Sequence, residues 1–106
     1  MKIRYLIAAA AALSLSTTAF ASDNGEASFK KSSCVSCHQQ DKKSVGPSLK
    51  DISAKYAADK GAQAKLETKV RTGGSGSFGS MPMPATPKTV ADADIKAMVT
   101  WILSLK

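Results

Sequence analysis

The sequence predicts a single all-helical domain, residues 22–106, with a thin hydrophobic core. Apolar residues recur three and four positions apart along much of this stretch, and no segment shows the alternating pattern of an amphipathic strand. Its aromatic residues are Phe29, Tyr56, Phe78 and Trp101, which are few for the core of 85 residues. A chain of this size often needs a staple or a bound group to complete its core.

Residues 1–21 have the pattern of a signal peptide. Lys2 and Arg4 give a positive start, an apolar Ala/Leu-rich run follows, and residues 19–21 (Ala-Phe-Ala) match the pattern that signal peptidase reads. The apolar run is shorter than the roughly 20 residues of a membrane-spanning helix. We therefore expect export, cleavage after Ala21 and no stable membrane insertion; an uncleaved anchor is the less favoured alternative.

Two short amphipathic stretches predict the first two helices. One covers about residues 27–31, with Phe29 as its buried side chain. The second begins near Ser48 and carries Leu49 and Ile52 at helical spacing.

A long Gly- and Pro-rich loop, residues 73–88, is expected between the last two helices. The third helix covers about residues 62–71 and ends before this loop. The fourth starts at about Val90, with Thr89 as its N-cap and Asp92 in a first turn that favours carboxylates. Its apolar stripe consists of Ile95, Met98, Val99, Ile102 and Leu105.

The chain is basic, with a formal net charge of +7, or +5 once Lys2 and Arg4 are removed with the signal peptide. A solvated lysine-rich surface that aids solubility accounts for this charge, and so does steering towards an acidic partner. Nucleic acid is a poor third option, because residues 22–106 contain one Arg and no basic run longer than two.

Cys34-Val35-Ser36-Cys37-His38 is the strongest motif in the sequence. Cys-x-x-Cys-His is the attachment pattern of c-type haem. The spacing lets both thiols add to the two vinyl groups on one edge of the porphyrin, and the imidazole of His38 can then reach the iron as proximal ligand. The motif therefore predicts one haem c, bound covalently through Cys34 and Cys37.

Two other interpretations of the cysteine pair are weaker. A redox-active dithiol belongs on the strand–helix junction of a βαβ fold, which this sequence does not predict. A structural zinc site needs four ligands, whereas the chain has two Cys and one His.

Because His38 is the only histidine, the sixth iron ligand has to be sought among the methionines. Met98 lies on the apolar stripe of the last helix, so we expect it in the core. Met81 and Met83 lie within residues 80–84, where prolines stiffen the backbone and a thioether can reach the face opposite His38. The residues themselves do not decide between Met81 and Met83, and an ordinary apolar contact to haem is an alternative role for either.

These features together resemble the small bacterial class I cytochromes c, the mono-haem carriers of the periplasm in respiring and denitrifying bacteria. The matching residues span most of residues 22–106: Phe29 five before Cys34, the motif Cys34 to His38, Val45-Gly46-Pro47, Asp51 to Tyr56, the Gly-rich loop into Pro82-Met83-Pro84, and Trp101-Ile102-Leu103-Ser104. The resemblance implies an all-α fold of about four helices around one haem, with Met83 as the distal ligand. It also implies that Phe29 and Trp101 meet where the first and last helices cross.

Two further roles follow from the same resemblance. The Pro47 carbonyl would accept the Nδ1 proton of His38, with a plain turn as the alternative, and Lys69 would lie near a haem propionate, with a solvated helix lysine as the alternative. Phe78 is a departure, because relatives often carry there a Trp whose indole N–H bonds a propionate, and Phe has no such donor.

The leading functional hypothesis is a periplasmic electron carrier, not an enzyme, that exchanges single electrons between respiratory redox partner proteins. The rival is a haem sensor or catalytic haem protein with an open or labile sixth position. We expect a monomer that docks on acidic partners through lysines near the haem edge. The lysines closest in sequence to the haem motif are Lys30, Lys31, Lys42 and Lys43.

Overall fold

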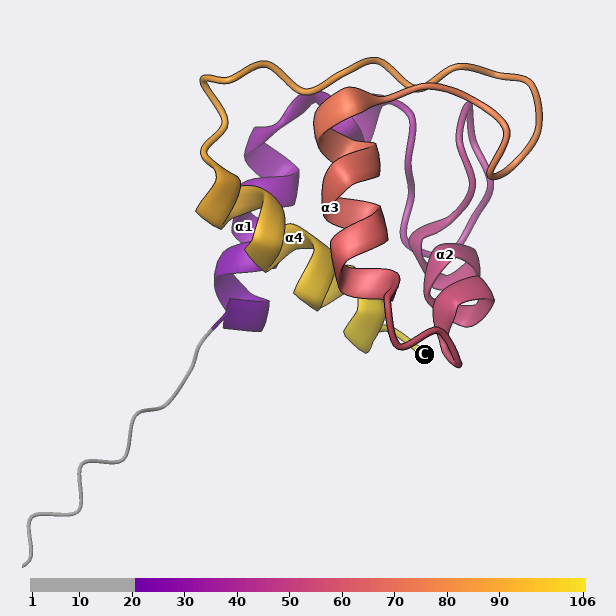
Figure 1. Ribbon diagram of the computed structural model, residues 1–106, viewed down its shortest axis with the longest axis horizontal. Coiled ribbons are helices and arrows are strands. Elements are labelled where there is room, and N and C mark those ends of the chain that lie inside the picture. The colour runs from indigo at the N-terminus through magenta and orange to yellow at the C-terminus, as the bar shows by residue number, and fades with distance from the viewer. Residues whose placement is uncertain (1–20) are drawn as a thin grey trace, which may run out of the picture.

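The computed structural model describes residues 21–106, which form four α-helices and one short 3₁₀ turn (Figure 1). In chain order these are α1 (Ala21–Lys31), the 3₁₀ turn η1 (Ser33–Ser36), α2 (Leu49–Tyr56), α3 (Ala62–Thr72) and α4 (Asp92–Ser104). Among these residues the structure has no β-strand, only an isolated antiparallel β-bridge between Gly74 and Met83. The predicted all-α class is confirmed.

The expected signal peptide, residues 1–21, lies outside the described residues except for Ala21, so it stays a prediction. None of the described helices has both the length and the apolar character needed to cross a bilayer.

The ends of α2 and α3 lie close to their predicted positions, and local chemistry explains both. Ser48 caps α2, since its Oγ accepts a hydrogen bond of 3.0 Å from the Asp51 N–H. The residue after α3, Gly73, has a φ of 67°, which glycine adopts without steric penalty, and its N–H donates to the Lys69 carbonyl at 2.7 Å.

The first helix, α1, begins at Ala21, well before the predicted start near residue 27. Its first half is polar and shows no apolar periodicity, which is why the pattern missed it. Gly25 explains the difference, because it is buried against α4, and a Cβ atom there would lie 2.1 Å from the Ala97 carbonyl oxygen. The missing side chain lets the two helix backbones approach, so tertiary packing stabilises the first turns.

The predicted start of α4 was two residues too early, and Thr89 is not its N-cap. The helix begins at Asp92, and the N-cap is Ala91, which has an extended backbone. The segment before it forms a turn instead of helix, in which the Val90 N–H donates to the Pro87 carbonyl at 3.0 Å. As expected, Asp92 lies in the first turn of the helix.

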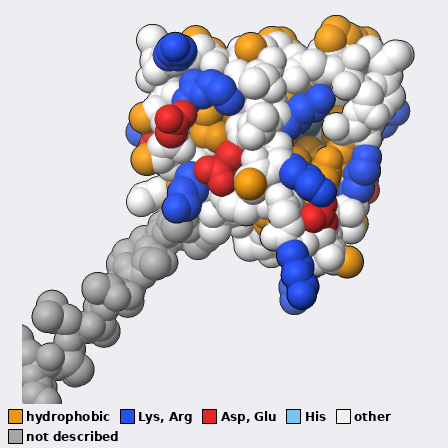
Figure 2. Space-filling view, viewed as in Figure 1, with side chains coloured by type: hydrophobic (Ala, Val, Ile, Leu, Met, Phe, Trp, Pro, Cys, Tyr) orange, Lys and Arg blue, Asp and Glu red, His pale blue; other side chains and the backbone are white. Residues whose placement is uncertain are grey.

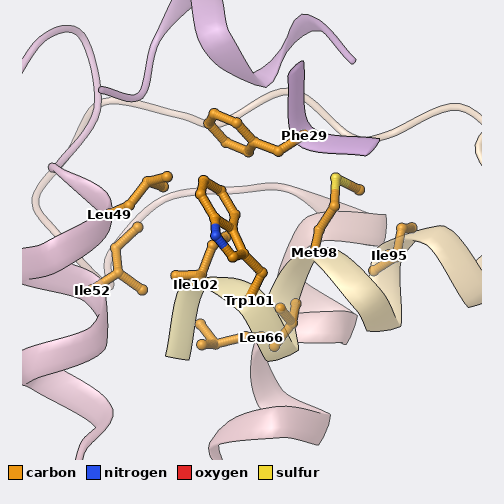
Figure 3. Packing of buried hydrophobic residues seen from close by; sticks show 9 residues of the cluster. Phe29, Leu49, Ile52, Leu66, Ile95, Met98, Trp101 and Ile102 are labelled. Carbon is orange, nitrogen blue, oxygen red and sulfur yellow. The ribbon is translucent and has the colours of Figure 1, made fainter. Parts of the chain in front are cut away.

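The core forms where α1 crosses α4, with α2 and α3 closing its sides (Figures 1 and 3). The rings of Phe29 and Trp101 meet in this crossing with their centroids 5.4 Å apart and their planes tilted by 50°, as expected from the resemblance. Met98 is only 2% exposed, which confirms it as a core residue. The other large members are Leu49, Ile52, Leu66, Ile95, Val99 and Ile102.

Replacing Gly25 with alanine tests the close helix crossing. Helix propensity alone would make Gly25→Ala stabilising by about 1 kcal/mol. We expect instead a loss of about 1–3 kcal/mol in the free energy of unfolding, because the new methyl group overlaps the Ala97 carbonyl and the Trp101 side chain. Denaturant unfolding of the purified protein measures the change.

Gly61→Ala is the matched control, since a Cβ atom there would come no closer than 3.4 Å to the nearest atom reported around it. We expect its free energy of unfolding to change by less than about 1 kcal/mol. A Gly25→Ala protein more stable than the wild type would contradict the crossing.

Candidate functional site

A largely apolar pocket lies between η1, the segment that leads into α2, and the loop that joins α3 to α4. Its empty volume is about 1070 Å³, part of it open to solvent. Core side chains such as Leu49 and Met98 form part of its wall. The pocket also brings together the residues predicted from sequence, namely Cys34, Cys37, His38, Pro47, Lys69, Met81 and Met83.

The 3₁₀ turn η1 directs the Cys-x-x-Cys-His motif into this pocket. The Cys34 carbonyl accepts hydrogen bonds from the Cys37 N–H at 3.1 Å and from the His38 N–H at 2.9 Å. The chain therefore turns back on itself, so that all three side chains line one space. Both cysteines are half-buried free thiols, and burial raises the pKa of the Cys34 thiol above its ordinary value.

The imidazole of His38 is fixed by the two residues that precede Ser48. Its Nδ1 lies 2.8 Å from the Pro47 carbonyl oxygen, which can only accept, so Nδ1 carries the proton and Nε2 keeps its lone pair for a metal. The ring also packs on Gly46, where a Cβ atom would lie 2.7 Å from His38 Cε1. Gly46 and Pro47 therefore do more than form a turn: they set the orientation of the ring.

The two methionines of the loop between α3 and α4 differ in exposure and in backbone pairing. Met81 is 65% exposed, whereas Met83 is half-buried and paired with Gly74 through two reciprocal backbone hydrogen bonds of 2.9 Å. Gly73 permits this pairing, because a Cβ atom there would come within 2.3 Å of the Met83 carbonyl oxygen. Sequence reasoning from the residues alone could not separate the two methionines, since this pairing joins positions nine apart.

Lysine side chains lie beside the same loop. Lys69 is half-buried, and its Nζ donates to the Ser75 carbonyl at 3.4 Å. Lys55 of α2 donates to the Ser77 carbonyl, and its Nζ lies 4.3 Å from the centroid of the Phe78 ring. Lys55 was not predicted from the sequence, where it reads as one more exposed helix lysine.

The lip of the pocket is apolar, and Lys69 is among the residues that line the pocket. Val45, Phe78 and Met81 line the pocket and are each more than 40% exposed. Figure 2 shows separate Lys and Arg side chains scattered over the face in view, with some Asp and Glu side chains and hydrophobic atoms between them. Each of the lysines proposed for docking, Lys30, Lys31, Lys42 and Lys43, is exposed.

The residues at this pocket fit a covalently bound haem. Two free thiols and an imidazole oriented by its own hydrogen bond come from one segment, and thioethers come from the loop across the pocket. The walls between them are apolar, as a porphyrin requires. The site therefore brings two thiols, an imidazole and thioether side chains together in one apolar pocket.

Comparisons with known proteins agree with this geometry. The family model described as cytochrome c matches residues 22–106. The chain is 51% identical over 77 residues to cytochrome c-552 of Nitrosomonas europaea, covering 73% of this chain and 74% of that protein. It is 42% identical over 84 residues to cytochrome c-551 of Azotobacter vinelandii, covering 79% of this chain and 100% of that protein.

Among solved structures, the crystal structure of wild-type Nitrosomonas europaea cytochrome c552 aligns with a TM-score of 0.72 at 48% identity. The alignment covers 76% of this chain and 99% of that one. The class 1 cytochrome MtoD of Sideroxydans lithotrophicus aligns with a TM-score of 0.69 at 32% identity, over 78% of this chain and 94% of that one.

Gly46→Ala tests whether the imidazole depends on its glycine support. The new methyl group would overlap His38 Cε1, so either the ring or the backbone has to move away from the Pro47 carbonyl. We expect the free energy of unfolding of the haem-loaded protein to fall by about 1–3 kcal/mol. Ser44→Ala, at an exposed position of the same segment outside the pocket lining, is the control, with an expected change below about 0.5 kcal/mol. Equal stability of Gly46→Ala and the wild type would show that the contact has no energetic role.

Proposed function

The chain belongs to the cytochrome c family, and from this premise we propose which of its residues hold the haem and how they support electron transfer. It is a small class I bacterial cytochrome c with one covalently bound c-type haem, and its function is to carry electrons. When bound, the haem supplies a one-electron couple between ferric and ferrous iron. The remaining assignments are to this chain's own side chains.

Cys34 and Cys37 form the two thioether bonds, and His38 is the proximal ligand. The hydrogen bond of 2.8 Å between His38 Nδ1 and the Pro47 carbonyl supports this assignment, since it leaves Nε2 as the metal-binding nitrogen. Such a bond also raises the donor strength of the iron-bound nitrogen and stops the ring from rotating.

Met83 is the sixth ligand, and its backbone pairing with Gly74 is the observation that carries this proposal. The pairing keeps Met83 in the pocket wall across from the haem motif, while Met81 is largely exposed. A thioether ligand favours the ferrous state and raises the reduction potential, as suits a respiratory carrier. With His38 and Met83 both holding the iron, no position would be left for a substrate, so the bound haem would exchange electrons only and the protein would not act as an enzyme.

The carrier works in the periplasm as a monomer and meets its redox partners through the basic surface around the pocket. An export signal in residues 1–21, cleaved after Ala21, supports the location. The formal charge of +5 on residues 22–106 supports steering towards acidic partners. Lys69 lies against the pocket and supplies a positive charge for a haem propionate.

Met83→Ala tests the sixth ligand directly. We expect the ferric protein to lose the weak far-red absorption of iron bound to a thioether sulfur, and the ferrous protein to bind carbon monoxide at neutral pH. Met81→Ala is the matched control and should keep the band and exclude carbon monoxide. If the band is absent from the wild type, or disappears in Met81→Ala and survives in Met83→Ala, the assignment is wrong and the sensor hypothesis gains support.

Ionic strength tests the basic docking surface. We expect electron exchange with an acidic redox protein to slow as salt is added, and Lys42→Gln/Lys43→Gln to reduce the low-salt rate by about two- to fivefold. Lys60→Gln/Lys96→Gln removes the same charge from exposed positions far in sequence from the haem motif, so its effect should be smaller. A rate that is independent of salt would rule out electrostatic docking.

A further inference from the structure

Arg71, near the end of α3, is the one arginine of residues 22–106 and joins α3 to the segment that leads into α4. Its side chain is 25% exposed. Its Nη1 donates to the Thr86 carbonyl at 3.3 Å and to the Pro87 carbonyl at 3.0 Å. Its Nη2 donates to the Val90 carbonyl at 2.8 Å and to Asp92 Oδ1 at 2.6 Å.

These contacts close the loop that carries Met83. On one side, Met83 is paired with Gly74 next to the end of α3. On the other side, three residues further on, the Thr86 N–H donates to the carbonyls of Val70 at 3.2 Å and Arg71 at 3.3 Å, while the Thr86 carbonyl accepts from the Arg71 guanidinium. Thr86 is thus held to α3 through both its backbone groups.

We propose that Arg71 is a positioning residue for the sixth iron ligand, because it clamps the far side of the Met83 loop onto α3. This inference rests on the proposed role of Met83. Arg71 is not among the residues that line the pocket, and it acts by limiting how often the loop moves away from α3. Figure 1 shows the length of chain to be held, the orange segment that runs from the end of α3 across the molecule to α4.

The three backbone carbonyls, rather than the ion pair, give the clamp its strength. Hydrogen bonds from a charged guanidinium are stronger than those between neutral groups. Asp92 is 95% exposed, so its ion pair with Arg71 is screened by water and contributes little. A lysine carries its donors on a single nitrogen and cannot span acceptors placed along five residues, so Arg71→Lys can replace only part of the clamp.

An added ligand can bind the iron only while Met83 is detached. Its apparent affinity is therefore its intrinsic affinity multiplied by the fraction of molecules in which the thioether has left. A weaker clamp raises that fraction, and it raises the apparent affinity by the same factor. Imidazole is a suitable probe, because it binds ferric haem in place of a weak thioether ligand.

The experiment is a titration of the ferric, haem-loaded protein with imidazole, followed by the far-red absorption. For Arg71→Ala we expect imidazole to bind about tenfold more tightly than to the wild type, which corresponds to about 1.4 kcal/mol. Arg71→Lys should lie between the two, and it also serves if Arg71→Ala does not fold. Asp92→Asn, which keeps the contacts to the carbonyls, should bind imidazole within about twofold of the wild type.

Gly25→Ala is the control for global stability, since it is expected to weaken the fold at the α1–α4 crossing and not at the loop. Its imidazole affinity should match the wild type even though its free energy of unfolding is lower. The inference is overturned if both Arg71 variants bind imidazole like the wild type, or if Gly25→Ala tightens binding as much as Arg71→Ala. If the wild type itself lacks the far-red band, Met83 is not the sixth ligand. The assignment of Met83 and the positioning role of Arg71 are then both wrong.

Discussion

The structure depends on one constraint: residues 22–106, 85 in all, must bring the haem motif and Met83 from two distant segments into a single apolar pocket. His38 and Met83 are more than forty residues apart in the sequence, and the core of the domain is small. The crossing of α1 and α4 provides the rigid base, since Phe29 and Trp101 meet there and Met98 passes from the core into the pocket wall. The other helices pack against α4, so the positions of the residues that line the pocket are set by this crossing.

The two sides of the pocket are built on different physical principles. On the proximal side, short-range contacts suffice: η1 presents the motif, and the Pro47 carbonyl orients His38 from nine residues away. The Met83 loop contains no helix, so it depends on its backbone hydrogen bonds to α3 and on cationic side chains that bind its carbonyls, among them Lys55 and Arg71. A ligand on such a loop can detach without unfolding the rest of the chain.

Much of this could be predicted from the sequence, because the decisive signals are local. Helical spacing located α2, α3 and α4, and the Cys-x-x-Cys-His motif identified the covalent haem of the family, while His38 as its proximal ligand stays a prediction. The early start of α1 was missed because it depends on Gly25 fitting against Ala97, a contact between distant parts of the chain. The clamp by Arg71 was missed for the same reason, since no spacing rule connects a helix residue to carbonyls 15 to 19 positions later.

The most direct measurement is a crystal structure of the ferric, haem-loaded protein at a resolution that places the iron ligands. The account predicts His38 Nε2 on one face of the iron, the Met83 sulfur on the other, and thioether bonds from Cys34 and Cys37. Iron bound by the Met81 sulfur, or by a water molecule in place of a methionine, would contradict it. In that case the pairing of Met83 with Gly74 would have no role in ligation.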